Sequence, residues 1–456
     1  MNIIANSEIE TLEGELGNFR VTVSHKPRFI DPVTCTGCGN CASHCPVAAV
    51  DTYNKGLQYR KASYIDYPQA IPLSFAIDQE ACIGCGLCEK MCLAGAVKYD
   101  DQPSSTELRV GSVILCPGSE EYNPSDLDHL SYGIHPNVIT SAEFERILSA
   151  SGPYFGNLTR PYDRQEPKKI AWLQCVGSRD INRTKNSYCS SVCCMYAIKE
   201  AMIAKEHAHA DMDCAIFNMD IRTFGKDFEK YYNRAKDEQG VRFIKSRVHS
   251  VVPIQDSGDL ALQYFAESGE LQEEIFDLVV LSVGLQIQPS TIELARKLGL
   301  ELNASNFATT KTFSPVETSR PGIYVSGVFQ GPKDIPESVT EASAAACAAG
   351  APLAAARHTE TRSVELPEEQ DISNEELRIG VFVCNCGINI AGGVDTKAVT
   401  SYASELPGVA YAGINLFTCS EDAQNNMKAI IQEKQLNRVV VASCSPKTHE
   451  PIFMDT

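Results

Sequence analysis

The chain has 456 residues, of which 43% are hydrophobic and 21% charged, and its formal net charge is −18 at pH 7. This composition indicates a folded protein of several domains and excludes a disordered chain or a coiled coil. The excess of acidic residues disfavours nucleic acid as a partner. No segment approaches the ~20 apolar residues of a membrane span, and the N-terminus lacks a signal-peptide pattern. We therefore expect a cytoplasmic protein without a membrane span, whose 19 cysteines act as ligands rather than as disulfides.

A cysteine-rich segment follows a predicted β-hairpin. Residues 7–24 alternate like a hairpin around Gly14 to Gly17, and residues 28–100 then contain two runs with the spacing Cys-x2-Cys-x2-Cys-x3-Cys. In two-cluster ferredoxins, three cysteines of each run hold one [4Fe-4S] cluster and the fourth ligates the other cluster. One cluster is therefore predicted on Cys35, Cys38, Cys41 and Cys92, and a second on Cys82, Cys85, Cys88 and Cys45. A zinc site is the weaker alternative, because zinc prefers two separated cysteine pairs.

Residues 168–284 have the pattern of a dinucleotide-binding module. Strands are expected at 168–173, 214–218 and 241–245, and helices at 192–207 and 226–238. The loop after the first strand lacks Gly-x-Gly-x-x-Gly, and the region instead contains Cys175, Cys189, Cys193 and Cys194. Their spacing alone leaves a metal site and buried thiols equally open. Cys116, Cys214 and Cys347 stand alone in apolar surroundings and are expected in the core.

Three segments are predicted to be strands that each end in a glycine turn, at 108–118, 275–284 and 321–327. The last is followed by an alanine-rich helix, for which Asp334 and Glu337 form a predicted capping box. A helix N-terminus that faces a pocket stabilises negative charge, as a reduced flavin requires. An ordinary capped core helix is the alternative. Residues 358–377 are rich in glutamate and predict an exposed acidic linker.

Cysteines also follow three predicted strands near the C-terminus. The strands lie at 379–383, 411–417 and 438–442, with helical stretches between them. That alternation is typical of a parallel sheet, whose carboxyl ends collect ligands. Cys384, Cys386, Cys419 and Cys444 lie at those ends, which predicts a further [4Fe-4S] site, with structural thiols or a lost site as the alternatives.

Together these motifs resemble the A subunit of heterodisulfide reductase, a family of iron-sulfur flavoproteins. The matching segments are Gly17 to Phe19, Lys26 to Arg28, both cysteine runs, Pro136 to Ser141, Gln174 to Asp180, Cys189 to Tyr196, Asp220 to Gly225, Gln330 to Ile335 and Arg378 to Phe453. The resemblance implies a [4Fe-4S] cluster on Cys175, Cys189, Cys193 and Cys194 beside an FAD. It also implies that the flavin faces Gly327, Gly331, Pro332, Lys333, Asp334 and Ile335.

The implied fold class is α/β, with thioredoxin-reductase-like dinucleotide-binding domains, an inserted α+β two-cluster ferredoxin domain and a C-terminal partial α/β module. The expected domains are a remnant of the flavin-binding domain over 1–27 and 101–167, the ferredoxin insert over 28–100, a second dinucleotide-type domain over 168–284, a return to the flavin domain over 285–357, the acidic linker over 358–377 and the partial module over 378–456.

Two departures from the family are visible. No Gly-x-Gly-x-x-Gly loop for the FAD pyrophosphate occurs in the chain, and Cys116-Pro117-Gly118 stands where the family has Ala-Thr-Gly. The C-terminal module also stops just after His449-Glu450-Pro451, where relatives continue. We therefore expect an internal piece of a longer protein or one half of a split subunit.

The function implied by the resemblance is an electron-transferring oxidoreductase subunit. It would move electrons between a flavin, the implied site of electron bifurcation, and [4Fe-4S] clusters. The implied partners are other subunits of a heterodisulfide-reductase-like complex and a hydrogenase, dehydrogenase or ferredoxin-type electron partner. No catalytic acid or base is identified. The alternative is a flavin-free, polyferredoxin-like electron conduit or adapter, favoured by the missing pyrophosphate loop and disfavoured by the Gln330 to Ile335 segment.

Overall fold

The structure is a computed structural model that describes residues 2–67, 70–255, 257–359, 371–386 and 390–456, together with residues 361 and 368. Glu360, Glu365 and Glu369 of the predicted acidic linker lie outside the described residues. Among the helices that are described, none is long and apolar enough to cross a membrane.

The N-terminal hairpin is confirmed. Strands β1 (Ser7–Glu15) and β2 (Asn18–His25) pair antiparallel, and β7 (Ser104–Val110) adds to β2 to give the sheet order β1-β2-β7. The cysteine-rich insert, residues 28–100, leaves this sheet after β2 and returns at β7. It contains two short helices, α1 (Asn40–Ser43) and α2 (Leu87–Met91), and the small strand pairs β3 (Ala49–Val50) with β4 (Tyr59–Arg60) and β5 (Ser63–Tyr64) with β6 (Ala76–Ile77).

The central module is built on a five-stranded parallel sheet in the order β10-β17-β11-β12-β13. Its strands are β10 (Val138–Thr140), β11 (Lys169–Val176), β12 (Asp213–Asn218), β13 (Arg242–Lys245) and β17 (Leu278–Val283). Trp172 and Ile216 face the helices α3 (Ser141–Leu148) and α4 (Cys193–His207) in one apolar core. Leu173 and Phe217 face the opposite core. Buried contacts on both faces explain why these strands are continuously apolar.

The opposite face of the central sheet is covered by a small antiparallel sheet, β14 (Ser250–Pro253), β15 (Leu260–Phe265) and β16 (Leu271–Phe276). The predicted helix at 226–238 is present as α5 (Phe228–Asn233) followed by a π-helical turn over Arg234–Glu238. The module predicted over residues 168–284 is larger in the structure, because β10 and α3, which the prediction assigned to the flavin-domain remnant over 101–167, pair with and pack on its central sheet.

Two predicted strands are wrong in extent, because each is divided between two sheets. The segment predicted at 108–118 forms β7 and then β8 (Val113–Leu115), with a change of direction at Gly111. A side-chain carbon at Gly111 would lie 2.5 Å from the Leu353 side chain, so the glycine allows the backbone to approach Leu353 closely. The segment predicted at 275–284 similarly divides at Asp277 into β16 and β17, where the Asp277 carboxylate accepts hydrogen bonds from the backbone N–H groups of residues 168 and 169.

A third sheet has the order β19-β20-β21-β8, formed by β19 (Thr310–Lys311), β20 (Ser314–Thr318), β21 (Ile323–Val325) and β8. Helix α7 (Ile335–Gly350) packs on one face of this sheet. The N-terminal hairpin and α6 (Pro289–Lys297) pack on the other face. A two-stranded link, β9 (Glu120–Glu121) with β18 (Leu285–Gln286), leads from this sheet to the central module.

The prediction of core positions holds for only one of the three isolated cysteines. Cys214 on β12 is fully buried, whereas Cys116 and Cys347 are exposed. Cys116 lies beyond the end of β8. Cys347 lies on α7, where the buried residues are Ala345 and Ala349. A run of small side chains predicts a helix but does not show which of its faces is covered.

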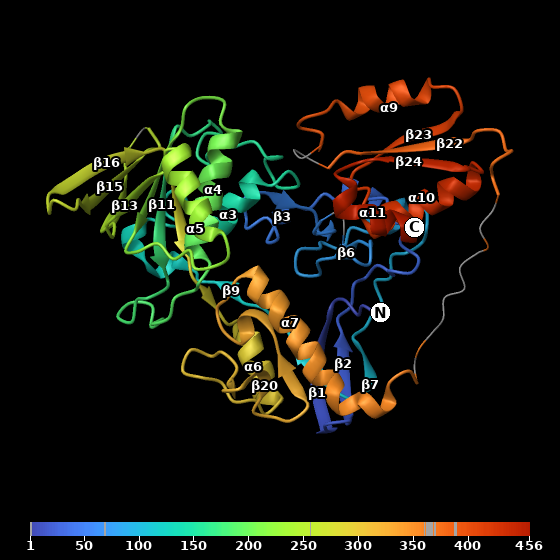
Figure 1. Ribbon diagram of the computed structural model, residues 1–456, viewed down its shortest axis with the longest axis horizontal. Helices are drawn as coiled ribbons and strands as arrows, with labels where there is room; N and C mark the ends of the chain where they lie inside the picture. Colours follow the sequence, from blue (N-terminus) through green and yellow to red (C-terminus); the bar gives the residue numbers. More distant parts are fainter. Residues whose placement is uncertain are drawn as a thin grey trace.

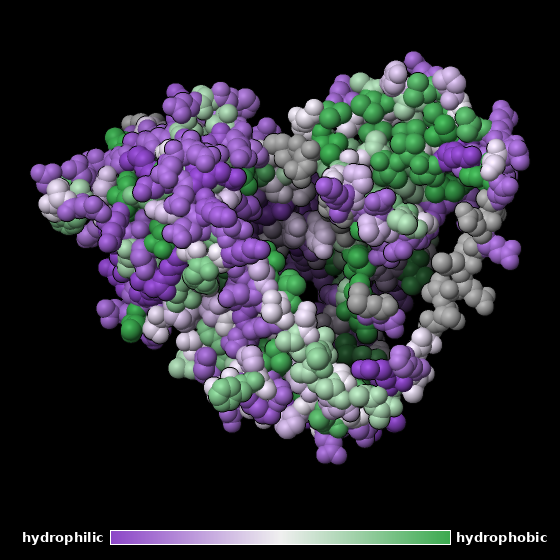
Figure 2. Space-filling model, in the orientation of Figure 1, coloured by the Kyte–Doolittle hydropathy of each residue, from purple (hydrophilic) through white to green (hydrophobic). Residues whose placement is uncertain are grey.

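The C-terminal module, residues 371–386 and 390–456, is a separate parallel sheet in the order β23-β22-β24. Its strands are β22 (Ile379–Cys384), β23 (Val409–Asn415) and β24 (Arg438–Ala442), with helices α9 (Thr396–Ser404), α10 (Glu421–Glu433) and α11 (Pro446–Asp455). It lies beside the cysteine-rich insert (Figure 1). Hydrophobic surface gathers over this module (Figure 2), whose exposed apolar side chains include Val439 and Val440. The predicted parallel order is confirmed.

Candidate metal centres

The two cysteine runs of the insert have the same local geometry. In each run the backbone turns through glycines with positive φ, at Gly37 and Gly39 before α1 and at Gly84 and Gly86 before α2. These left-handed turns place the third cysteine of each run, Cys41 and Cys88, in the buried core of the insert. The outer cysteines Cys38 and Cys85 are exposed.

One of the two predicted four-cysteine sets surrounds a common cavity. Cys45 of the first run and Cys82, Cys85 and Cys88 of the second run line a small enclosed space, together with Ile77 and Tyr99. Although burial opposes it, backbone N–H groups of neighbouring residues lower the pKa of Cys45. The amide of Gly84 donates to the Cys82 sulfur at 3.4 Å. Amide donors directed at sulfur stabilise thiolate ligands, so these residues fit an iron-sulfur cluster.

The other predicted set is brought together less completely. Burial, with added contributions from the charges of Cys35 and Cys38, raises the pKa of Cys41, so these three thiols lie near one another. The remaining predicted member, Cys92, packs on the same apolar core as Cys35 and Cys41. Its sulfur accepts a 3.3 Å hydrogen bond from the amide of Ala96.

Four cysteines of the central module, Cys175, Cys189, Cys193 and Cys194, form what we call the central cysteine set. Cys175 lies near the end of β11 with a left-handed φ of 62°, where the pairing with β17 shifts register between Leu173 and Val176. A bulge of this kind re-aims a side chain, and a non-glycine residue in this conformation is strained. Cys193 and Cys194 occupy the first turn of α4 and are 6% exposed each.

The thiols of the central cysteine set lie close enough to affect one another. Burial raises the pKa of Cys193 to about 12, and the charges of Cys175, Cys194 and Cys189 raise it further. Burial raises the pKa of Cys194 to about 11, with further contributions from Cys175 and Cys189. Buried thiolates without a positive partner are unfavourable. The set therefore either stays protonated or holds a metal centre, which deprotonates its thiol ligands.

Within the described part of the chain, no group of three or more cysteine, histidine, aspartate or glutamate side chains lies close enough to hold a single metal ion. Zinc binds sulfur at about 2.3 Å, which requires its ligands to crowd around one point. In this conformation the described cysteines are therefore more widely spaced than the ligands of a bound zinc ion.

An apolar cavity of about 630 Å³ lies between the first turn of α4 and the start of α7. Its walls include Met195 and Tyr196 of α4, Phe224 and Tyr231 on the α5 side, and Ile335 of α7. The predicted capping box of α7 is confirmed: Asp334 accepts from the Glu337 amide at 2.8 Å, and Glu337 accepts from the Asp334 amide at 3.1 Å. The volume falls in the roughly 300–1,000 Å³ range of cofactor pockets.

The residues predicted to face a flavin divide into two groups. Asp334 and Ile335 line the apolar cavity. Lys333 instead turns inward, where its Nζ pairs with the Glu341 carboxylate and donates to Gln330 at 2.6 Å. The other oxygen of Glu341 accepts the Gly327 amide at 2.9 Å. A side-chain carbon added at Gly327 or Gly331 would have no heavy atom within 4 Å, and Pro332 lies between Gly331 and the buried Lys333.

The C-terminal cysteines also converge. Cys384 is 3% exposed at the end of β22. Although burial opposes it, hydrogen bonds from Thr418 and Cys386 lower the pKa of Cys384. Burial, followed by the neighbouring thiols of Cys384 and Cys444, raises the pKa of Cys386 to about 11. The charges of Cys384 and Cys444 also act on Cys419, so the four predicted residues gather at the carboxyl ends of the three strands.

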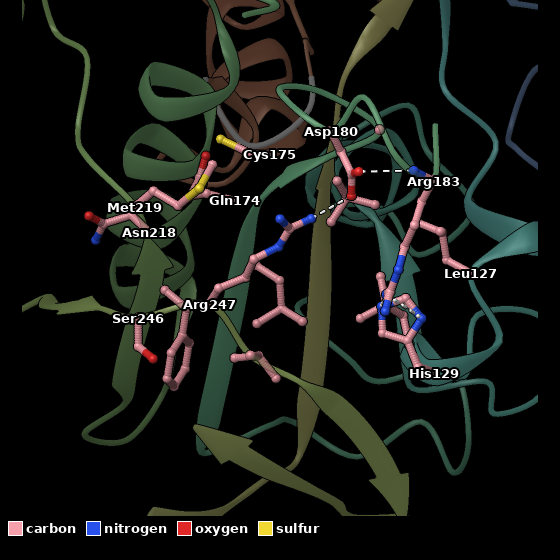
Figure 3. A pocket seen from close by; sticks show the side chains of 16 residues that line it. Leu127, His129, Gln174, Cys175, Asp180, Arg183, Asn218, Met219, Ser246 and Arg247 are labelled. Carbon is pink, nitrogen blue, oxygen red and sulfur yellow. Dashed lines mark hydrogen bonds and ion pairs between the residues drawn. The ribbon is translucent and has the colours of Figure 1, made fainter. Parts of the chain in front are cut away.

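A second cavity lies at the carboxyl ends of β11, β12 and β13, where a dinucleotide-binding sheet would hold its ligand. It encloses only about 40 Å³. Arg247 pairs with Asp180 at 2.7 Å, and Arg183 donates to His129 at 2.8 Å; both contacts cross this space (Figure 3). In this conformation the space at the strand ends is smaller than the roughly 300–1,000 Å³ of a cofactor pocket, and the loop after β11 lacks Gly-x-Gly-x-x-Gly.

Three charged residues that the sequence motifs did not predict as site residues lie beside the central cysteine set. Arg179 donates to the Cys175 sulfur at 4.0 Å and pairs with Asp220, and Arg222 binds the other Asp220 oxygen at 3.3 Å. Both segments, Gln174 to Asp180 and Asp220 to Gly225, were singled out as motifs. Nothing in the sequence showed that the end of β12 returns to the loop after β11.

Comparisons with known proteins bear on the cysteine-rich insert and on the chain as a whole. Residues 34–96 match the family described as a 4Fe-4S dicluster domain. The A subunit of the H(2)/formate:CoB-CoM heterodisulfide,ferredoxin reductase of Methanococcus maripaludis is 43% identical over 356 residues, which cover 77% of this chain and 54% of the relative. The iron-sulfur A subunit of the CoB--CoM heterodisulfide reductase of Methanocaldococcus jannaschii is 42% identical over 357 residues, covering 78% and 54%.

A protein of Archaeoglobus profundus that is described as similar to the heterodisulfide reductase A subunit is 38% identical over 408 residues, covering 76% of this chain and 56% of the relative. The chain thus spans about half the length of the curated relatives it matches. Among solved structures, T. acidophilum thioredoxin reductase is 14% identical with a TM-score of 0.35, covering 55% of this chain and 68% of that one.

Proposed function

Over the residues matched by its relatives the chain belongs to the family of heterodisulfide reductase A subunits, and on that premise we propose that it is an electron-transferring iron-sulfur flavoprotein subunit. The [4Fe-4S] clusters would supply one-electron carriers, and FAD would supply the two-electron chemistry that they divide. The function covers oxidation and reduction, with no acid or base assigned a catalytic role.

One observation carries this function. The buried central cysteine set, at the start of α4, adjoins an apolar cavity whose other side is the capped start of α7. The proposed cluster site and a cavity large enough for a flavin ring therefore both border the first turns of α4. Because the N-terminus of α7 carries partial positive charge, it favours a ligand that becomes negative on reduction.

Different residues of this chain would have different roles in the proposed function. The ligands would be Cys35, Cys38, Cys41 and Cys92, then Cys82, Cys85, Cys88 and Cys45, then the central cysteine set, and Cys384, Cys386, Cys419 and Cys444 in the C-terminal module. Met195, Tyr196 and Ile335 would exclude water from the flavin ring. The Glu341 carboxylate holds the turn at Gly327 and the buried Lys333 ammonium, so it sets the loop that leads to α7.

We further propose that the flavin is a bifurcation site and that the electrons pass to partner subunits of a heterodisulfide-reductase-like complex, with a hydrogenase, dehydrogenase or ferredoxin-type partner. The C-terminal module and the insert share a cavity of about 580 Å³, lined by Cys35 on one side and Phe417 on the other. Their closeness supports transfer between these two cysteine regions within one chain.

A flavin-free electron conduit is the second candidate, and the lack of a Gly-x-Gly-x-x-Gly motif in this sequence favours it. The chain should be reconstituted anaerobically with iron, sulfide and FAD, then desalted and examined by visible spectroscopy. The proposed function predicts flavin bands that survive desalting. Iron-sulfur absorbance alone would support the conduit.

A pair of matched variants makes this experiment specific to the cavity. Ile335→Trp adds a ring where α7 lines the cavity, at a side chain that is 79% exposed. Val339→Trp adds the same ring one turn later, at a side chain that is 61% exposed and does not line the cavity. Flavin retention should fall in the first variant and persist in the second, with equal iron content in both. Equal flavin retention in both variants would place the flavin elsewhere.

A further inference from the structure

We propose that Arg179, held in position by Asp220, is a fixed positive charge that raises the reduction potential of the centre formed by the central cysteine set. This inference rests on the proposed function, because it requires a cluster on Cys175, Cys189, Cys193 and Cys194. It concerns a positioning residue that touches a ligand sulfur, and nothing in the chain's motifs assigned it a role.

The guanidinium of Arg179 contacts both the thiol and the carboxylate. Its Nη1 lies 4.0 Å from the Cys175 sulfur, and the same nitrogen pairs with the Asp220 carboxylate. The second Asp220 oxygen accepts from Arg222 Nε at 3.3 Å. One carboxylate is thus shared between two guanidinium groups, so a net positive charge lies beside the thiols in a chain whose formal charge is −18.

The backbone directs Arg179 toward Cys175. Arg179 has a left-handed φ of 56°, and the residue two positions before it, Gly177, has a φ of 76°. A side chain at Gly177 would meet the Tyr122 ring at 2.2 Å, so only glycine fits there. The Arg179 amide then donates to the Tyr188 carbonyl at 3.0 Å. These contacts hold the loop in a conformation that most residues avoid.

The end of β12 completes the arrangement from the other side. The Cys194 thiol donates to the Asp220 carbonyl at 3.9 Å. The backbone N–H of Arg222 also hydrogen-bonds to the Cys194 sulfur. The backbone of the segment from Asp220 to Arg222 therefore contacts Cys194. The Asp220 side chain in the same segment holds the Arg179 guanidinium next to Cys175.

The sign of the effect follows from electrostatics. Reduction adds one negative charge to a cluster, and the potential of a cluster depends on nearby charge and on hydrogen bonds to its sulfurs. A cation held beside a ligand stabilises the reduced form more than the oxidised form. Arg179 therefore makes the potential less negative, which favours this centre as an electron acceptor.

The test is an anaerobic redox titration of the reconstituted full chain, followed by electron paramagnetic resonance and accompanied by iron analysis. Arg179→Gln should lower the reduced-to-oxidised ratio about tenfold at the wild-type midpoint potential, which is a shift of about 59 mV to more negative potential for a one-electron couple. Arg179→Lys should recover at least half of that shift, because it keeps the charge. Arg183→Gln is the matched control, since its guanidinium in the same loop donates to His129 and makes no hydrogen bond to a cysteine among the described residues.

An unchanged potential in Arg179→Gln would overturn the inference. So would a shift in Arg179→Lys or in Arg183→Gln as large as the shift in Arg179→Gln. If Arg179→Gln loses iron, Arg179→Lys becomes the decisive variant. An Arg179→Lys chain with the iron content and the potential of the wild type supports the role of the charge, whereas iron loss in Arg179→Lys refutes that role. A wild-type chain without a third cluster signal would refute the proposed function at this site. A wild-type signal without any shift would refute only the role of Arg179.

Discussion

Replacing Glu200 by glutamine should stabilise the central module, and the gain should grow with pH. Glu200 is a buried residue of α4, 0% exposed, whose Oε2 accepts a 2.8 Å hydrogen bond from the Trp172 indole N–H. Its Oε1 has no partner among the described residues. Burial, followed by the charge of Glu145, raises the pKa of Glu200 well above its usual value. The folded chain therefore keeps this carboxyl protonated to a higher pH than the unfolded chain does.

The magnitude follows from proton linkage. Below the unfolded-state pKa of about 4.3, both states carry the proton and the group has no effect on stability. Above that pH the unfolded chain loses the proton while the folded chain retains it, so stability falls by about 1.4 kcal/mol per pH unit until the folded-state pKa is reached. At pH 7 the deficit is at most about 3.7 kcal/mol. Glutamine keeps the acceptor for Trp172 and removes the deficit.

Urea unfolding followed by tryptophan fluorescence measures this effect, because Trp172 is the only tryptophan in the chain. The gap in unfolding free energy between Glu200→Gln and the wild type should widen between pH 6 and pH 7.5, by at most about 2 kcal/mol. Glu206→Gln, at an exposed position of the same helix, should show no such widening. A Glu200→Gln gap that is equal at the two pH values would refute a protonated, buried carboxyl.

Three further outcomes are expected. Serine at both Cys193 and Cys194 should lower the bound iron by about four atoms per chain, whereas serine at the isolated, buried Cys214 should leave the iron content unchanged. Equal iron losses in the two variants would refute a cluster on the central cysteine set. Arg146→Ala should weaken the attachment of the insert by about 1–3 kcal/mol, because Arg146 donates to Asn54 at 2.9 and 2.8 Å. Faster hydrogen exchange across residues 51–58 would report it, and unchanged exchange would contradict it. Asp334→Ala should cost about 1 kcal/mol through loss of the α7 cap, measured by circular dichroism during thermal unfolding; an unchanged midpoint would show that packing alone holds α7.

Local patterns predicted the parts of the fold that depend on near neighbours in the sequence. The hairpin of β1 and β2, the helix α4 and the capping box at Asp334 are confirmed within a residue or two. Each depends on residues a few positions apart, through alternation, apolar periodicity or a side chain that accepts a neighbouring amide. The cysteine runs belong to this group, because their glycines and short spacing specify the turns.

The sequence patterns failed where a strand's course depended on a distant partner. Segments 108–118 and 275–284 are continuous in their apolar pattern, yet each crosses between two sheets. Gly111 divides one because Leu353, far along the chain, packs against it. The prediction that Cys116 and Cys347 are buried was wrong for the same reason, because burial depends on which element covers a residue.

By itself the sequence determined the kinds of site in this protein: two ferredoxin-type runs, an unusual cysteine set in place of a phosphate loop, and a third cysteine group after parallel strands. Only the tertiary structure decided that Cys45 shares a cavity with Cys82 and that a bulge turns Cys175 toward Arg179. It also decided that the apolar cavity adjoins the central cysteine set. Ligand type and spacing are local properties of a chain, whereas the charge and space around a ligand come from segments that meet only when their apolar faces pack together.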